Sequence, residues 1–383
     1  MAVRPRVLES LADLPAAHWD AVANPSWHAF NPFVSHAFLS ALEESGCVSA
    51  KAGWLPHHIL LEEDGTVVGA APCYVKSHSQ GEYVFDHGWA EAFQRAGGRY
   101  YPKLQVSVPF SPVPGPRVLA ASLEHRMALL AALADEVKAT RASSAHITFM
   151  PEADWQAAPA PWLKRQDIQF HWQNAGYENF DSFLAALSSN KRKNIRKERR
   201  AVSEQGITFR HVTGKDLTED DWDHFFAFYM DTGSRKWGRP YLNRLFFSIL
   251  GERLRDHVLL VMAMRGGKTI AGALNLIGSD RLFGRNWGCS EDHPFLHFET
   301  CYYQAIDFAI ARGLTVVEAG AQGEHKLARG YVPIKTHSLH YFAHAGLARA
   351  VSDYLEQERA AVDEQREVLA EHAPFRHTPD EQD

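Results

Sequence analysis

Residues 281–319 read RLFGRNWGCSEDHPFLHFETCYYQAIDFAIARGLTVVEA, and this stretch decides the fold of the second half of the chain. Residues 281–287 and the β-branched run within 314–319 predict two strands. Between them, apolar residues at helical spacing predict an amphipathic helix over 297–311. A strand, a helix and a second strand predict a right-handed crossover between parallel strands. The loops that follow the two strands then leave the same edge of one sheet.

The second of these loops carries acid, base and cationic groups together. It lies within residues 315–331, TVVEAGAQGEHKLARGY, where three glycines permit close backbone approach. Open α/β sheets bind ligands at the carboxyl edge of their strands, which favours a site over the alternative of a solvated surface loop. The candidates are Glu318, Glu324 or His325 as proton acceptor, Lys326 and Arg329 as anion-binding groups, and Tyr331 as proton donor.

Composition narrows the class of protein. The chain has 383 residues, 45% of them hydrophobic, which suffices for two to three domains. Its net charge of -6 predicts no DNA partner, and nucleic-acid binding would need a local basic patch. The four cysteines show neither ligand spacing nor a disulfide framework, and no stretch is apolar enough to span a bilayer, so we expect a cytoplasmic protein. The oligomeric state is left open.

The two halves of the chain repeat one order of elements. Helical patterns precede an apolar hairpin in each half, and Val68-Gly69-Ala70 after one hairpin turn is similar to Ala271-Gly272-Ala273 after the other. The fold class predicted is α/β with mixed sheets, in modules 1–165 and 166–349, followed by a helix and a disordered tail over 350–383. The expected helices cover 16–23, 35–45, 122–140, 180–205, 218–232 and 241–254, and strand-like pieces include 83–85.

A basic helix and a strand supply further candidate binding residues. Residues 191–200, KRKNIRKERR, hold seven basic residues and one acid, and Lys191, Arg192 and Arg196 are candidates for contact with tRNA phosphates or a phosphorylated substrate. The alternative is a solvated helix face. Arg285 is either a stacked structural arginine or, as we favour, an anion clamp beside Trp287. His293 and His297 are four residues apart, but Pro294 interrupts them, so no metal site is predicted.

Several blocks of the sequence resemble the FemAB-like predicted N-acyltransferases, a peptidoglycan-biosynthesis-type family of the GNAT superfamily. The blocks are HGWAEAF at 87–93, YYPKLQ at 100–105, PFSPVPGPRVL at 109–119, SSNKRKNIRKERR at 188–200, KWGRPYLNRLFF at 236–247, LHFETCYYQAI at 296–306 and GAQGEHKLARGY at 320–331. The resemblance implies two tandem GNAT-like acyltransferase modules, and its first two blocks add His87 and Lys103 as candidate substrate-binding residues.

The resemblance also bears on the acyl donor. Ordinary GNAT enzymes hold the pyrophosphate of acyl-CoA on a glycine-rich loop between the strand and helix that here end at 287 and begin at 297. This chain has Glu291, Asp292 and Pro294 in that loop, which disfavours acyl-CoA at the usual place. Relatives in the family pass an amino acid from aminoacyl-tRNA to an amine of a cell-wall precursor, so aminoacyl-tRNA is a candidate donor and tRNA a candidate partner. No cofactor is assigned.

The predicted function is transfer of an acyl or aminoacyl group to an amine, by direct attack of the amine on an ester or thioester carbonyl. Such a transferase needs a proton acceptor and hydrogen-bond donors for the developing oxyanion. The alternative is a non-catalytic module that binds RNA or a cell-wall ligand through the basic helix. A metal hydrolase is a third class, and it would require bound metal.

Overall fold

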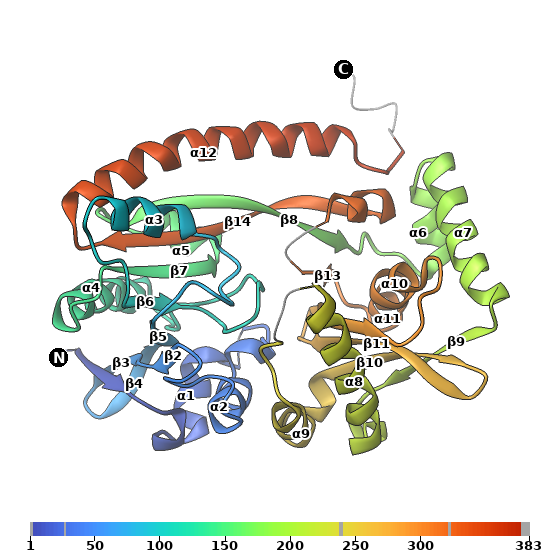
Figure 1. The fold of residues 1–383 in the computed structure, drawn as a ribbon, viewed down its shortest axis with the longest axis horizontal. Coiled ribbons are helices and arrows are strands. Elements are labelled where there is room, and N and C mark those ends of the chain that lie inside the picture. The colour runs from blue at the N-terminus through green and yellow to red at the C-terminus, as the bar shows by residue number, and fades with distance from the viewer. Residues whose placement is uncertain (1–2, 27, 237–239, 321–322, 377–383) are drawn as a thin grey trace. The chain divides into compact units, whose positions relative to one another are not determined.

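The computed structural model describes residues 3–26, 28–236, 240–320 and 323–376 (Figure 1). The chain divides into two compact units. Unit 1 takes the residues up to Ile168 together with Lys335–Glu364, and unit 2 takes Gln169–Ile334 together with the residues from Gln365 onward. The first boundary lies close to the expected 165. The second differs from the expected 349, because most of strand β14 (Tyr331–Phe342) pairs with a strand of unit 1 far away in the sequence.

Unit 1 contains two sets of paired strands. A small antiparallel sheet has the order β1-β3-β4, and a mixed sheet has the order β2-β5-β6-β7-β14, in which β6 and β7 run parallel. The bounds are β1 Arg4–Leu8, β2 Trp54–Pro56, β3 His58–Glu63, β4 Thr66–Ala71, β5 Cys73–Lys76, β6 Lys103–Val106 and β7 Ser144–Met150.

The mixed sheet of unit 1 has one apolar and one polar face. Helix α4 (Leu123–Ala139) begins at the N-cap Ser122 and packs Leu129 and Leu133 on the apolar face. Residues alternate across a strand, so Lys76 and Lys103 lie on the opposite face, where both are fully buried. Charged groups at such positions require ionic partners.

The remaining helices of unit 1 largely follow the sequence patterns. They are α1 Ala16–Ala23, α2 His36–Glu44, α3 His87–Arg95, α5 Glu152–Ala157 and α12 Ala345–Glu371, whose last residues belong to unit 2. The helices expected at 16–23, 35–45 and 122–140 are confirmed to within their caps. The strand expected at 83–85 is wrong, because this segment is a loop in which Tyr83 has a φ of 59°.

Unit 2 contains the crossover predicted from residues 281–319. Its strands pair in the order β8-β13-β12-β11-β10-β9, and β12 and β13 are parallel, with Arg281 opposite Val316 and Phe283 opposite Glu318. The strand bounds are β8 Leu163–Gln173, β9 Ile207–Val212, β10 Val258–Arg265, β11 Lys268–Ile277, β12 Arg281–Cys289 and β13 Val316–Glu318.

Helices of unit 2 pack closely against this sheet. Their bounds are α6 Phe180–Ala186, α7 Ser189–Glu204, α8 Glu219–Lys236, α9 Arg244–Arg253, α10 Leu296–Phe298 and α11 Gln304–Ala311, with a π-helical segment Glu299–Tyr303 between the last two. Helix α8 packs so closely on β12 that a Cβ at Gly288 would lie 2.1 Å from the carbonyl oxygen of Phe228. Glycine is therefore required there.

The single helix expected over 180–205 is wrong, because the chain breaks at Leu187. Leu187 is extended and bridges Phe375, and the Ser188 amide donates to the Pro374 carbonyl. The pairing of these backbone groups with the chain end replaces the helical hydrogen bonds that residues 187 and 188 would otherwise make. Residues 374–376 are therefore paired rather than disordered, and the rest of the expected tail lies outside the described residues.

Candidate active site

The two loops of the crossover leave the carboxyl edge of β12 and β13 in unit 2. Strand β13 ends at Glu318, whereas β12 continues to Cys289, so the later part of β12 extends beyond its pairing with β13. Beyond β12 the chain enters α10 and then the π-helical segment, a local widening of the helix that is frequent at functional sites. Beyond β13 it forms a 3₁₀ helix over Glu324–Arg329.

His325 and Tyr302 meet at this edge. The Tyr302 hydroxyl lies 2.9 Å from His325 Nε2, and the exposed imidazole is also close to the rings of His297 and Phe298. Desolvation lowers the pKa of His325, and the cations Arg329 and Lys326 lower it further. Burial raises the pKa of Tyr302. At neutral pH the pair is therefore a neutral imidazole that accepts a hydrogen bond from a protonated phenol.

Arg329 fixes the 3₁₀ helix that carries His325. Its guanidinium donates to the His325 carbonyl at 2.7 Å and to Glu198 Oε1 at 2.9 Å, and its central carbon lies 3.4 Å from the centroid of the Phe298 ring. The residue is 7% exposed. Arg329 is thus already engaged by a carboxylate and a ring, so we assign it a positioning role, and its predicted contact with an anionic substrate stays a prediction.

Glu198 connects this arginine to a second ion-pair network. Tyr303 donates to the other oxygen of Glu198, and the neighbouring Arg199 bonds to Asp307 at 2.7 Å and to Glu299 at 3.0 Å. One face of the basic helix α7 is therefore occupied by structural contacts with the π-helical segment and α11. These contacts hold the 3₁₀ helix and the crossover helix together.

Lys326 and Tyr331 are buried beside the exposed histidine. Lys326 is 1% exposed, and its ammonium donates to the Gly320 carbonyl at 3.0 Å. Burial lowers the pKa of Lys326 to about 8. Tyr331 is fully buried against Tyr302, and no described residue bonds to its hydroxyl. Burial raises the pKa of Tyr331 well above the ordinary value, so its phenol stays protonated.

Of the two carboxylates predicted as proton acceptors, the structure describes the side chain of Glu318 but not that of Glu324. Glu318 is 3% exposed and its Oε1 accepts from the partly exposed Arg281 at 3.0 Å, so it takes part in a half-buried ion pair at the paired end of β12 and β13. The backbone of Glu324 belongs to the 3₁₀ helix, but its side chain lies outside the described residues. Both assignments stay predictions.

The two predicted substrate-binding residues of unit 1 have different surroundings. His87 is exposed at the start of α3, with its ring near that of Phe85. Lys103 is fully buried, and its ammonium donates to Ser79, Glu82 and Asp86. Because a lysine ammonium has three donors, these three oxygens saturate it.

The predicted binding residues of the basic helix lie on α7. Lys191 and Arg192 are partly exposed, and Arg196 is exposed and pairs with Asp181 at 3.1 Å. The helix also exposes Lys193, Lys197 and Arg200. A cationic surface therefore remains on the side of α7 away from Arg199, and the structure leaves its binding role as a prediction.

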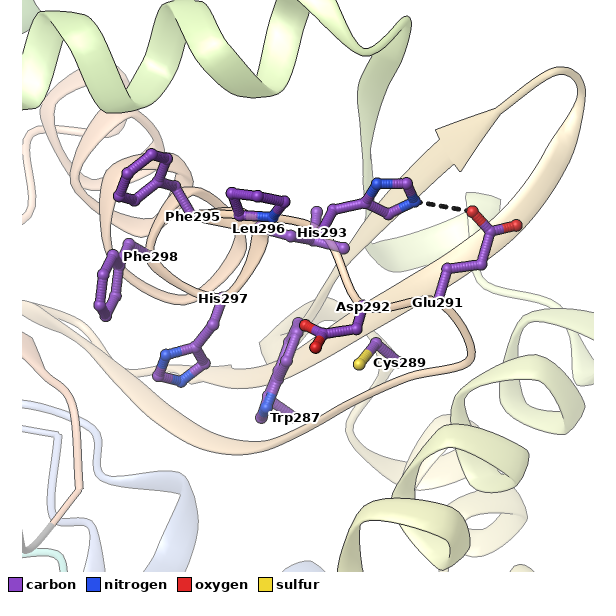
Figure 2. A pocket seen from close by; sticks show the side chains of 10 residues that line it. Trp287, Cys289, Glu291, Asp292, His293, Phe295, Leu296, His297 and Phe298 are labelled. Atoms are coloured by element: carbon purple, nitrogen blue, oxygen red, sulfur yellow. Dashed lines mark hydrogen bonds and ion pairs between the residues drawn. The ribbon is translucent and has the colours of Figure 1, made fainter.

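A cavity of about 260 Å³ opens in the loop after β12 (Figure 2). Ten residues line it: Trp287, Cys289, Glu291, Asp292, His293, Pro294, Phe295, Leu296, His297 and Phe298. The Trp287 and His297 rings are 4.9 Å apart, and His293 contacts Glu291 at 2.7 Å and Gln205 at 2.8 Å. Arg285, two residues before Trp287, is partly exposed on the same strand. The loop thus presents carboxylates and rings in place of glycine amides.

Sequence reasoning missed Tyr302, Glu198 and Tyr303 as site residues. Tyr302 counts simply as an apolar position in the helical pattern, and the π-helical turn that orients it has no sequence signature. The sequence gives one indication that Glu198 is special, because it is the lone acidic residue among the seven basic residues of 191–200. Its partner Arg329 is 131 residues away, so the ion pair could not be read from local spacing.

Two further features are absent from the described residues. Within that part of the chain, no group of three or more histidine, cysteine or acidic residues is arranged to hold a metal ion. None of the helices described there combines the length and apolar character needed to cross a bilayer.

Comparison with solved structures shows the fold. FemX is similar at a TM-score of 0.57 and 12% identity, over 92% of this chain and 100% of FemX. The C-terminal domain of a putative lysylphosphatidylglycerol synthetase from Agrobacterium fabrum is similar at 0.53 and 10%, over 90% and 96% of the two chains. L-PGS from Bacillus licheniformis is similar at 0.51 and 9%, over 91% and 99%.

These likenesses confirm the predicted mixed α/β fold, and its division into two tandem GNAT-like modules stays a prediction. No curated protein sequence matches the chain. A family model described as peptidoglycan biosynthesis and recognition matches residues 10–377, which is nearly the whole chain. The protein therefore belongs to the FemAB-like family, as the sequence blocks suggested.

Proposed function

We propose that the protein transfers an acyl or aminoacyl group from an activated ester or thioester to an amine on a cell-wall precursor. Membership of a family described as peptidoglycan biosynthesis and recognition supports the cell-wall setting. The observation that carries the chemistry is the hydrogen bond between Tyr302 and His325 at the carboxyl edge of unit 2, next to the buried ammonium of Lys326.

The contacts suggest how a proton leaves the amine. The Tyr302 oxygen accepts a proton from the substrate ammonium while its own proton passes to His325 Nε2, over the 2.9 Å hydrogen bond between them. The amine nitrogen then attacks the carbonyl carbon and forms the new C–N bond. The ammonium of Lys326 stabilises the oxyanion that develops on the carbonyl oxygen. When the C–O or C–S bond of the donor breaks, the leaving group takes the proton from His325, and the amide nitrogen releases its remaining extra proton to solvent water.

Aminoacyl-tRNA is the donor that the surroundings favour. Glu291 and Asp292 in the loop after β12 repel the pyrophosphate of an acyl-CoA, whereas the exposed residues Lys193, Lys197 and Arg200 of α7 attract a phosphate backbone. This choice agrees with a cytoplasmic site of action.

The proposed donor predicts a salt-dependent interaction with α7. Exchange of Lys193 and Lys197 for alanine should weaken tRNA binding and reduce the slope of log affinity against log salt by about 1 for each phosphate that is no longer neutralised. Fluorescence anisotropy of labelled tRNA over a salt series measures this slope. Lys215→Ala, which removes an exposed cation elsewhere in unit 2, is the matched control. An unchanged slope in the double variant would place the tRNA elsewhere or exclude it.

A transfer assay tests the proposed function itself. The folded protein is incubated with a lipid-linked or nucleotide-linked muropeptide and either charged tRNA or acyl-CoA, and the muropeptide is analysed by mass spectrometry. The expected product is a muropeptide heavier by one aminoacyl group, formed from charged tRNA. Binding of donor and acceptor without any new amide would instead support the non-catalytic binding module.

The two shifted pKa values predict a rate plateau around neutral pH. Because the pKa of His325 is lowered, the free imidazole is available above it, and kcat/KM should rise with pH on the acid side, below 6.5. Because the pKa of Lys326 is about 8, the rate should fall again as this ammonium loses its proton above about pH 8. A pH–rate profile of the wild type and of Lys326→Met measures both limbs. Loss of the alkaline limb in the variant is expected, and its persistence would assign that limb to another group.

A further inference from the structure

The cavity after β12 combines aromatic walls with acidic groups, which is the composition that recognises a cation. Trp287, His297 and Phe298 present their rings to it, and Trp287 and His297 lie with their centroids 4.9 Å apart. Aromatic faces attract an ammonium group while they pack against the methylene groups that carry it. At about 260 Å³ the cavity is below the roughly 300–1,000 Å³ usual for sites of drug-sized ligands, and so it suits a group of amino-acid size.

The two carboxylates of the cavity are not equivalent. Glu291 is engaged by His293 at 2.7 Å and by Arg265 at 3.2 Å. Asp292 is exposed, and no described residue donates a hydrogen bond to it. In Figure 2 its carboxylate points toward Trp287 and His297, whereas Glu291 points to His293. One carboxylate therefore remains available to a ligand, next to the rings.

The cavity shares a wall with the candidate active site. The His297 ring lines the cavity, and its centroid lies 5.4 Å from that of Tyr302 and 6.4 Å from that of His325. A group held in the cavity is thus separated by about the width of the His297 ring from Tyr302 and His325, the pair that accepts a proton in the proposed reaction. The pyrophosphate of acyl-CoA, for which this loop is suited in ordinary GNAT enzymes, would meet two carboxylates here.

We propose that this cavity binds a primary ammonium group carried on an aliphatic carbon, with Asp292 as its ionic partner and Trp287 as its aromatic wall. The assignment of this ammonium group to a substrate rests on the proposed function, because in that reaction it belongs either to the acceptor or to the donor. It is the side-chain amine of the acceptor or the α-amine of an aminoacyl donor. Both present the same chemistry to the cavity.

Binding of small probes tests the inference without any transfer reaction. Nα-acetyl-lysinamide carries a side-chain ammonium, and alaninamide carries an α-ammonium next to a carbonyl. Their neutral counterparts are Nα,Nε-diacetyl-lysinamide and N-acetyl-alaninamide. Isothermal calorimetry of the full chain measures the affinity of each, and thermal unfolding without ligand shows whether every variant is folded.

The variants separate the ionic and the aromatic contributions. Asp292→Asn should weaken binding of the preferred ammonium probe about tenfold, while Asp216→Asn, at an exposed aspartate elsewhere in unit 2, should leave it unchanged. Trp287→Leu should weaken binding as well, and Trp287→Phe should restore part of the loss because it keeps an aromatic face. The tighter of the two ammonium probes identifies which substrate supplies the group.

The outcomes distinguish this inference from the proposed function. Equal affinity for charged and neutral probes, or an Asp292→Asn variant that binds as the wild type does, would overturn the ammonium site and leave transfer at His325 to be judged by its own assay. Conversely, His325→Ala should keep the affinity for the ammonium probe. If the probe binds as expected but no amide forms with any donor, the proposed transfer fails while the ammonium site stands.

Discussion

His325→Ala should reduce the rate of amide formation by about 10²–10⁴-fold, the usual contribution of a positioned general base. The reason is that in the proposed reaction the imidazole takes the proton that the Tyr302 hydroxyl, 2.9 Å away, releases when the amine is deprotonated. Because His325 is exposed, the midpoint of thermal unfolding should change little. Steady-state kinetics and a thermal scan of the same preparations measure both quantities.

Controls separate this effect from general damage and from the other candidate base. His18→Ala, which removes an exposed histidine of unit 1, should retain full activity. Tyr302→Phe keeps the ring and loses the hydroxyl, so it should lower kcat and alter the acid limb of the pH profile. If Glu324→Gln abolishes turnover while His325→Ala does not, the base is Glu324.

Lys103→Met should destabilise the protein by about 3–5 kcal/mol, because it removes the lysine partner of the buried Asp86 and leaves the buried Glu82 with only Lys76, at 3.6 Å. Lys103 holds Glu82 Oε2 at 2.6 Å and also bonds to Asp86, and all three side chains are at most 3% exposed. Burial alone would lower the pKa of Lys103, yet attraction to these two carboxylates raises it. Methionine keeps an unbranched side chain only one atom shorter than that of lysine, so the expected loss mainly reflects charge rather than volume. Urea unfolding at pH 7 measures it.

The destabilisation caused by Lys103→Met should decrease as the pH falls. In the wild type desolvation alone would raise the pKa of Asp86, but attraction to Lys103 and His146 and hydrogen bonds from Lys103 and Ser79 together lower it. Asp86 therefore contributes stability that disappears as pH falls through that pKa. In the variant the carboxylates that have lost Lys103 protonate more readily, which relieves the cost of burying their charge at acid pH. Lys51→Met, at an exposed lysine, is the control and should stay within about 0.5 kcal/mol of the wild type. A stable Lys103→Met that no longer binds substrate would support the substrate contact expected from the sequence.

Local patterns predicted much of the fold because the elements concerned carry their own signals. Helix α4 has a capping serine at 122 and leucines at helical spacing, and the crossover strands flank an amphipathic helix. Strand β14 was missed because buried polar residues such as His337 and His340 hide its alternation, and because its partner β7 is far away in the sequence. The break at Leu187 depends on residues 374–376, which no local pattern connects to it.

The candidate site could be placed from the sequence, but its internal contacts could not. Topology puts the loop of His325 and Lys326 at the carboxyl edge of the sheet, which the parallel pairing of β12 and β13 confirms. Which groups are exposed and which are consumed by ion pairs depends on tertiary packing. The sequence predicts that Arg329 is a cation that binds substrate, whereas in the structure it is bound to Glu198, a residue of a helix far away in the sequence.

The most direct test of the account is chemical rescue of the His325→Ala variant with imidazole. The rate of amide formation is measured on the muropeptide at increasing imidazole concentration and at several pH values. If the side chain of His325 accepts the proton, added imidazole should restore part of the lost rate, in proportion to the concentration of its neutral form. A variant that acylates the amine at the wild-type rate without imidazole would contradict the account.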